Sequence, residues 1–249
     1  MSTILILGGT SAVAVAYARL AMTDGHDLHL VGRNAPALTA NSTDLDARGT
    51  GGVSTSVMEL GVPADVPAGW SKILAAAPSI DHVLIAYGIL GDQDATQGDL
   101  PQLARNLDVN FNSAALWCEA AFTHFQEIGR GQITVIGSVA GDRGRQSNYH
   151  YGAAKGALDT FVSGMAHRAA RTVEADIGVT LVKPGFIDTP MTDGMDKSGP
   201  LWASPETVAK IIRRGEKKGR TQIYAPWFWR YILLIIKNVP FFVFKRTSL

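Results

Sequence analysis

The sequence is short of cysteine and of long apolar runs, and each shortage excludes a class of protein. Cys118 is the single cysteine among 249 residues, so no disulfide can form within the chain, and we expect a reducing, cytoplasmic environment. We interpret Cys118, which lies in a helical pattern, as a core residue rather than a nucleophile. No apolar run reaches the length of a membrane-spanning helix. The run Thr3–Leu7 lacks a preceding basic residue and is too short for the core of a secretory signal.

Net charge is also nearly absent, at +1, but the charges are unevenly distributed. Ten of the 23 basic residues lie between Lys210 and Leu249, where Glu216 is the single acidic residue out of 22. A basic segment on an acidic body predicts an anionic partner surface, although a solvated helix face explains Arg213–Lys218 equally well. Apolar residues at 46% and charged residues at 18% predict a globular protein, and we expect neither a nucleic-acid partner nor a bound metal.

Short apolar runs alternate with longer helical patterns along most of the chain. Strands that are apolar on both faces and are separated by helices predict an α/β fold, a doubly wound parallel sheet covered on both sides. The expected strands are Thr3–Leu7, Asp27–Val31, Val53–Met58, Asp81–Ala86, Gln132–Ser138, Gly178–Lys183 and Gln222–Tyr224. The expected helices are Ala12–Thr23, Ala68–Ala77, Leu100–Glu127 (either straight or bent) and Tyr149–Val173, whereas Asn34–Gly52 is rich in threonine, aspartate and glycine and carries no predicted element.

The chain shows no internal repeat and no linker-like segment. We therefore expect a single domain over residues 1–225, followed by an amphipathic C-terminal tail over residues 226–249. The longest irregular stretch is Phe186–Ala203, which contains two glycines and two prolines. Loops of this length beside the carboxyl ends of parallel strands predict a substrate lid.

A glycine-rich turn follows the first strand. Gly8-Gly9-Thr10-Ser11 leads directly into a helix, and such a turn lets peptide N–H groups approach a pyrophosphate. The full G-x-G-x-x-G pattern is absent, so this turn alone fits an ordinary tight turn equally well. The second strand ends in Gly32-Arg33, where an enzyme specific for NAD carries an acidic residue. Because the planar guanidinium of Arg33 suits a 2′-phosphate, the pair of signals predicts NADP(H) as the cofactor.

Tyr151 and Lys155 are four residues apart on a predicted helix, so they share one face. A nearby ammonium stabilises a phenolate and lowers the pKa of the tyrosine, as a proton donor to a carbonyl oxygen requires. Tyr149 has no lysine at the same spacing. Ser138 ends the preceding strand, and we expect its hydroxyl to point into the ligand crevice beside Tyr151. After the next strand, the turn from Pro184 to Thr189 places backbone groups against a carboxamide such as that of nicotinamide.

These motifs together resemble the short-chain dehydrogenase/reductase family, in family order and spacing, over about residues 3–225. The resemblance implies a Rossmann-type domain that binds NADP(H) and reduces a carbonyl group, and we expect a homo-oligomer. It also implies that Asn110 holds a water on a proton relay to Lys155, and that Lys155 binds the nicotinamide ribose. The expected catalytic residues are Asn110, Ser138, Tyr151 and Lys155. The expected cofactor-binding residues are Gly8, Gly9, Thr10, Ser11, Arg33, Gly88, Tyr151, Lys155, Pro184, Gly185, Ile187 and Thr189.

Two segments depart from the family pattern. Alanine replaces the later two glycines of the phosphate turn, at Ala12 and Ala14, which puts the pyrophosphate geometry in question. The usual Asn-Asn-Ala-Gly after the fourth strand is Ile85-Ala86-Tyr87-Gly88, so only Gly88 is retained. Neither change touches the proton-transferring group.

The last segment of the chain is rich in aromatic, apolar and basic residues. Trp227, Phe228 and Trp229 begin it, the run Phe241–Phe244 nearly ends it, and lysine and arginine flank both clusters. This composition is typical of a segment that lies in the headgroup region of a membrane. A helix that covers the core or a subunit interface is the alternative interpretation.

More loosely, the glycine turn, the Ala86-Tyr87-Gly88 segment and the Pro226-Trp227 tail are similar to the subgroup of decaprenyl-phosphoryl-2-keto-pentose reductases. That resemblance implies a ketosugar carried on a polyprenyl phosphate as substrate, a flavin oxidase as partner, and peripheral contact with the inner face of the membrane. A reductase of a soluble ketone or of an acyl-thioester remains an alternative. A nucleotide-sensing binding protein with the same fold is the non-enzymatic alternative, although a sensor does not need the proton donor Tyr151.

Overall fold

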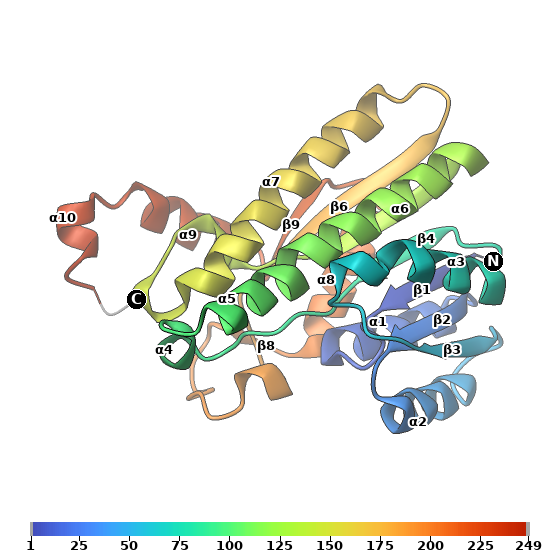
Figure 1. Ribbon diagram of the computed structural model, residues 1–249, viewed down its shortest axis with the longest axis horizontal. Coiled ribbons are helices and arrows are strands. Elements are labelled where there is room, and N and C mark those ends of the chain that lie inside the picture. Colours follow the sequence, from blue (N-terminus) through green and yellow to red (C-terminus); the bar gives the residue numbers. More distant parts are fainter. Residues whose placement is uncertain (1, 248–249) are drawn as a thin grey trace.

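The computed structural model describes residues 2–247, and at its centre is one parallel sheet of seven strands (Figure 1). The strand order is β3-β2-β1-β4-β5-β6-β9, so the direction of winding reverses between β1 and β4. This topology confirms the predicted doubly wound α/β fold. The strands are β1 (Thr3–Leu7), β2 (Asp27–Gly32), β3 (Val53–Val57), β4 (His82–Ile85), β5 (Arg130–Ile136), β6 (Asp176–Pro184) and β9 (Gln222–Ala225).

Helices cover both faces of the sheet because its central strands are apolar on both sides. Along β1, Leu5 and Leu7 pack into one apolar core, while Ile4 and Ile6 pack into the other. The first core lies under α3 (Val66–Ala76), α6 (Ser113–Ile128) and α7 (Tyr149–Arg171). The second lies under α1 (Ala12–Thr23), α2 (Ala35–Asp46) and α8 (Pro205–Glu216).

The stretch Asn34–Gly52, rich in threonine, aspartate and glycine, contains helix α2, which was not predicted. Asn34 caps this helix, since its Oδ1 accepts a hydrogen bond of 3.1 Å from the Ala37 N–H. Its core-facing side is narrow, with Leu38 and Leu45 as the buried residues, and the remaining threonine, serine and aspartate residues masked the helical pattern.

The long helix predicted over Leu100–Glu127 is interrupted in its middle. Helix α5 (Leu100–Leu107) passes through a π-helical turn, Asp108–Asn112, before α6 begins. Such turns insert an extra residue and frequently occur at functional sites. Here the turn carries Asn110, one of the expected catalytic residues.

The loop after β6 is the predicted lid segment, and Lys197 in its middle forms ion pairs with Asp188 and Asp193. The short strands β7 (Phe186–Ile187) and β8 (Trp202–Ala203) pair with each other, and a 3-10 turn covers Pro190–Thr192. A second short helix, α4 (Gln93–Thr96), lies in the loop after β4.

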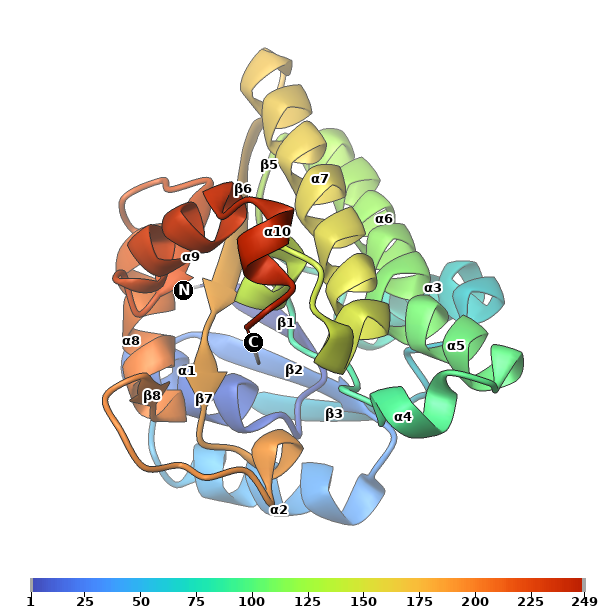
Figure 2. The same cartoon turned by 90° about the vertical axis from the view of Figure 1, so that its left-hand side faces the viewer.

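The C-terminal tail forms two helices, α9 (Trp229–Asn238) and α10 (Phe241–Phe244), at one end of the molecule in Figure 1, the side that faces the viewer in Figure 2. The inner side of α9 is anchored, because Trp229 and Leu233 are buried together with Val139 in a third apolar cluster. No helix among the described residues is long and apolar enough to cross a membrane. The division of the chain at residue 225 remains a prediction.

Arg143 also holds the tail against the loop that follows β5. Its Nη1 donates to the carbonyl oxygens of Ile236 and Val239, and its guanidinium lies 3.8 Å from the centre of the Phe244 ring. Ile236 lies in the last turn of α9, where its carbonyl oxygen also accepts the Val239 N–H, and Val239 directly follows the helix. The tail is thereby tied to the segment that begins at Ser138.

We predict that Leu233→Ala lowers the free energy of unfolding by about 2–3 kcal/mol, because truncation of a buried leucine leaves a cavity. Leu234→Ala is the matched control. Its side chain is 59% exposed, so the change should stay within about 0.5 kcal/mol. Urea denaturation of both variants measures the difference. Equal effects would show that α9 does not pack against the domain.

Candidate active site

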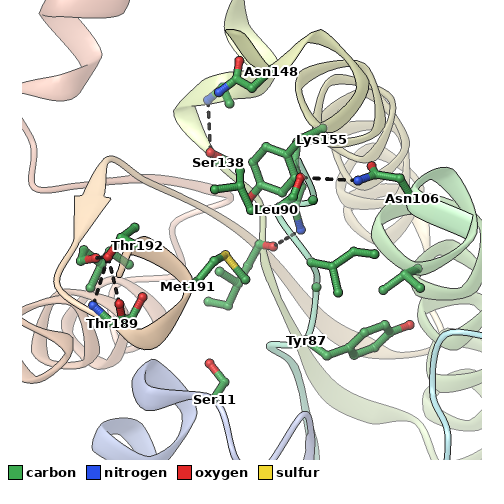
Figure 3. A pocket seen from close by; sticks show the side chains of 18 of the residues that line it. Ser11, Tyr87, Leu90, Asn106, Ser138, Asn148, Lys155, Thr189, Met191 and Thr192 are labelled. Carbon is green, nitrogen blue, oxygen red and sulfur yellow. Dashed lines mark hydrogen bonds between the residues drawn. The ribbon is translucent and has the colours of Figure 1, made fainter. Parts of the chain in front are cut away.

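A cavity of about 980 Å³ lies at the carboxyl ends of the parallel strands. Its wall is built from the segments that follow β1, β2, β4, β5 and β6, which meet there because parallel strands end at the same edge. Figure 3 shows Ser138 and Lys155 at one end of this cavity and Ser11 at the other, with Met191 from the lid segment between them. The cavity is large enough for a dinucleotide or a substrate to occupy.

The glycine turn after β1 packs closely against the backbone of the segment after β4. Gly8 has φ +97°, and a Cβ there would lie 2.8 Å from the backbone nitrogen of Tyr87. Ser11 begins α1 without capping it through its side chain, and Thr10 and Ser11 line the cavity. The first N–H groups of α1 therefore fit a phosphate of the cofactor.

The two alanines that replace family glycines do not close this site. Ala12 lies in the cavity wall, whereas Ala14 is fully buried against the sheet. Gly9 does not line the cavity. A Cβ at Gly9 would lie 2.8 Å from Cβ of Leu30. Glycine is therefore required at this position because the turn packs closely against β2.

Arg33 lies at the rim of the cavity, just after β2. Its side chain is 63% exposed, and its Nη1 lies 3.3 Å from Oε2 of Glu59. A backbone N–H from Gly61 and the Arg33 guanidinium lower the pKa of Glu59. The arginine is therefore accessible to an incoming phosphate, which would compete with the Glu59 carboxylate for the guanidinium.

The three residues of the predicted proton-transfer group line the same part of the cavity. Ser138 follows β5, while Tyr151 and Lys155 lie one turn apart on α7. The Nζ atom of Lys155 donates a hydrogen bond of 3.0 Å to the Ile136 carbonyl oxygen and lies 5.8 Å from the centre of the Tyr151 ring. The side chains expected to act on a carbonyl oxygen are thus brought together.

The pKa of Tyr151 departs from the expectation. Burial raises the pKa of Tyr151 to about 12, and a hydrogen bond with Ser138 opposes this rise. Burial also lowers the pKa of Lys155 to about 8, although the Asp159 carboxylate works against it. In the protein alone, the hydrogen bond with Ser138 acts to favour the phenolate. The expected effect of Lys155 on the pKa of Tyr151 stays a prediction for the enzyme with its cofactor bound.

Asn110 lies behind Gly88 and does not line the cavity. Its Oδ1 accepts from the Ile89 N–H at 3.0 Å, and its Nδ2 donates to the carbonyl oxygens of Ile89 and Asn106. A Cβ on Gly88 would lie 2.8 Å from this Oδ1 and 3.7 Å from Nζ of Lys155. Asn110 thus fixes the loop after β4 beside Lys155, and its expected part in a water relay remains a prediction.

The turn after β6 supplies the last expected residues. Pro184, Gly185, Ile187 and Thr189 all line the cavity. The N–H of Thr189 donates to Oγ1 of Thr192, which fixes the start of the lid segment.

Arg145 is a charged side chain in the cavity wall that sequence reasoning missed. Its guanidinium is half-buried, burial lowers its pKa, and it forms no ion pair with any of the residues 2–247. Asp92 and Asp94 also line the cavity, but both are exposed, and Asp92 Oδ1 already accepts from two backbone N–H groups. The arginine is therefore suited to an anionic group on a ligand. Its position between Ser138 and Tyr151 was the signal in the sequence.

His150, next to the tyrosine, was also missed. It is buried, its Nδ1 lies 3.0 Å from Oγ1 of Thr96, and its N–H donates to Oε1 of Gln93. These contacts join the start of α7 to α4, so they fix the position from which Tyr151 projects.

Comparison with known proteins is consistent with this geometry. The sequence model of the family described as short chain dehydrogenase matches residues 2–198, and the chain belongs to this family. An uncharacterized oxidoreductase of Streptomyces coelicolor is 32% identical over 248 residues, covering 98% of this chain and 95% of the relative. Another, of Mycobacterium tuberculosis, is 30% identical over 243 residues and covers 98% and 96%.

Solved structures give the same fold. A short-chain dehydrogenase from Sphingobium yanoikuyae in complex with NADPH is similar with a TM-score of 0.83 and 22% identity, over 97% of each chain. The protein is accordingly an oxidoreductase that acts on a CH–OH or C=O group, and its family binds NAD or NADP.

The pKa of Lys155 predicts how the rate depends on pH. The ammonium form stabilises the phenolate that remains when Tyr151 gives up its proton, so kcat/KM for carbonyl reduction should fall as the pH rises through about 8. The slope above that point should approach about tenfold per pH unit. Steady-state kinetics measures the profile. Lys155→Arg cannot lose its charge in this range, so its residual activity should show no such break. A wild-type rate that stays level up to the ordinary range of lysine contradicts the assignment.

Proposed function

We propose that the protein reduces a ketone to a secondary alcohol with NADPH. The observation that carries this proposal is the convergence of Ser138, Tyr151 and Lys155 in the wall of one cavity, beside the glycine turn after β1. When bound, NADPH supplies a hydride to the carbonyl carbon. The Tyr151 hydroxyl donates its proton to the carbonyl oxygen, and the Ser138 hydroxyl hydrogen-bonds the same oxygen as negative charge develops on it. Lys155 stabilises the resulting phenolate.

NADPH is proposed over NADH because of Arg33. No acidic residue stands directly after β2, and the exposed guanidinium at the cavity rim suits a 2′-phosphate. The unpaired N–H groups at the start of α1 support binding of the pyrophosphate, which does not discriminate between the two cofactors.

For the substrate, we propose a ketosugar carried on a polyprenyl phosphate. Two observations support this choice over a soluble ketone or an acyl-thioester. The unpaired Arg145 in the cavity wall suits the phosphate of such a substrate, and the exposed apolar side chains of α9 and α10 suit contact with the membrane that holds the lipid. We further propose a homo-oligomer located in the cytoplasm, in peripheral contact with the inner face of the membrane through the tail.

Tyr151→Phe tests the chemistry. Loss of the proton donor should lower the rate of ketone reduction by about 10²–10⁴ or more, while the affinity for NADPH, measured by fluorescence titration, stays close to wild type. Tyr149→Phe is the matched control, since Tyr149 lies two residues earlier on the same helix, is 43% exposed and does not line the cavity. Near-wild-type turnover in Tyr151→Phe would overturn the proposed mechanism.

Cofactor preference should depend on Arg33. Arg33→Asp removes the phosphate clamp and offers an acceptor to the ribose hydroxyls, so the ratio of kcat/KM for NADPH to that for NADH should fall, by about tenfold or more. Glu59→Gln is the informative control, because it frees Arg33 from its ion pair and should lower KM for NADPH. A wild-type enzyme that already prefers NADH contradicts the proposal.

A further inference from the structure

A second, smaller hollow of about 390 Å³ lies between the end of α8, strand β9 and the start of α9. Four basic side chains line it, and no acidic residue does. All four are exposed, and none forms an ion pair with another of the residues 2–247. They are Arg214, Lys218, Arg220 and Arg230.

Basic residues at neighbouring positions of α8 do form ion pairs, unlike the cations that line the hollow. Arg213 and Lys217 both form ion pairs with Asp24, which belongs to the end of α1. A basic helix face that merely keeps the protein in solution would not collect its unpaired cations around one hollow. The positive potential there favours an anion.

Two aromatic side chains of the tail, Trp227 and Tyr231, also line this hollow. Both are more than half exposed, at 69% and 57%, and Leu234 and Ile235 continue the same side of α9 at helical spacing. Phe241 and Phe242 of α10 are exposed as well, at 73% and 65%. Since the inner side of α9 is already packed against the domain, this outer apolar surface has no partner within the described residues.

The charges of the tail distinguish between the surfaces that could cover it. No acidic residue occurs after Glu216, whereas the tail also carries the exposed Lys245 and Arg246, and Lys237, which lies 3.8 Å from Asp142. A second copy of the same surface would bring like charges together. A membrane that contains anionic lipids matches both features, because aromatic and apolar side chains enter the headgroup region while basic side chains meet the phosphates.

We propose that this hollow binds the phosphate of an anionic lipid headgroup, and that α9 and α10 lie in the headgroup layer beside it. The inference rests on the proposed membrane contact and adds to it the site that recognises the lipid. The docked surface is also a neighbour of the active site, because Val139 and Phe186 line the catalytic cavity and pack against the inner side of α9.

Vesicle co-sedimentation tests the site. The full-length protein should bind mixed vesicles of phosphatidylglycerol and phosphatidylcholine, and bind pure phosphatidylcholine vesicles far more weakly. Neutralising three cations of the hollow, with Arg214→Gln, Lys218→Gln and Arg230→Gln together, should lower partitioning onto the anionic vesicles by about a hundredfold. The charge-matched control combines Lys72→Gln, Arg105→Gln and Arg171→Gln, three exposed residues without ion pairs on α3, α5 and α7, and should change partitioning by less than about threefold.

Each outcome decides the inference separately from the enzymatic proposal. Both triple variants should keep the wild-type melting temperature and NADPH affinity, since all six side chains are exposed. Equal losses in the two variants would mean that net charge rather than the hollow drives binding, which overturns the proposal. Binding of inorganic phosphate by calorimetry without binding of vesicles would also overturn it, as would a change from oligomer to monomer in the hollow variant with no vesicle binding by the wild type. None of these measurements depends on NADPH-dependent activity toward ketones.

Discussion

The hydrogen bond from the Lys155 ammonium to the Ile136 carbonyl oxygen is the contact on which the site depends. It fastens α7 to the end of β5, so that Tyr151 projects toward Ser138 at the carboxyl edge of the sheet. Burying an ammonium is unfavourable, and burial lowers the pKa of Lys155 for this reason. The same burial is the basis of the predicted fall in rate as the pH rises through about 8.

Further buried charges extend from this point toward the tail. Lys183 on β6 forms ion pairs with Asp142, in the turn after Ser138, and with Asp159, one turn after Lys155. Burial raises the pKa of Asp159 to about 6, although Lys183 opposes the rise. Tyr224 on β9 donates to Asp142, so the network joins the catalytic turn to the strand that leads into the tail. The residues at the start of the tail are thus in contact with residues beside the active site.

The fold and most of the site could be predicted because their signals are local. Strand β1 and helix α1 were predicted to the residue, since glycines punctuate strong apolar patterns there. Helix α2 was missed because its apolar side is narrow, and the π-helical turn at Asn110 because no sequence period marks it. Arg145 was missed for a different reason. Whether an arginine is paired depends on residues distant in the sequence, as the contrast with the paired Arg213 shows.

The central claim is that this cavity transfers a hydride to a carbonyl carbon while Tyr151 protonates the oxygen. The most direct test uses NADPH with deuterium at both hydrogen positions of the nicotinamide C4, incubated with the protein and a polyprenyl-phosphoryl ketopentose or, separately, a panel of soluble ketones. The account predicts that one deuterium appears on the new carbinol carbon of one of these products, as measured by mass spectrometry. Tight NADPH binding without transfer of deuterium to any carbonyl compound would contradict it and would favour a nucleotide-sensing protein built on the same fold.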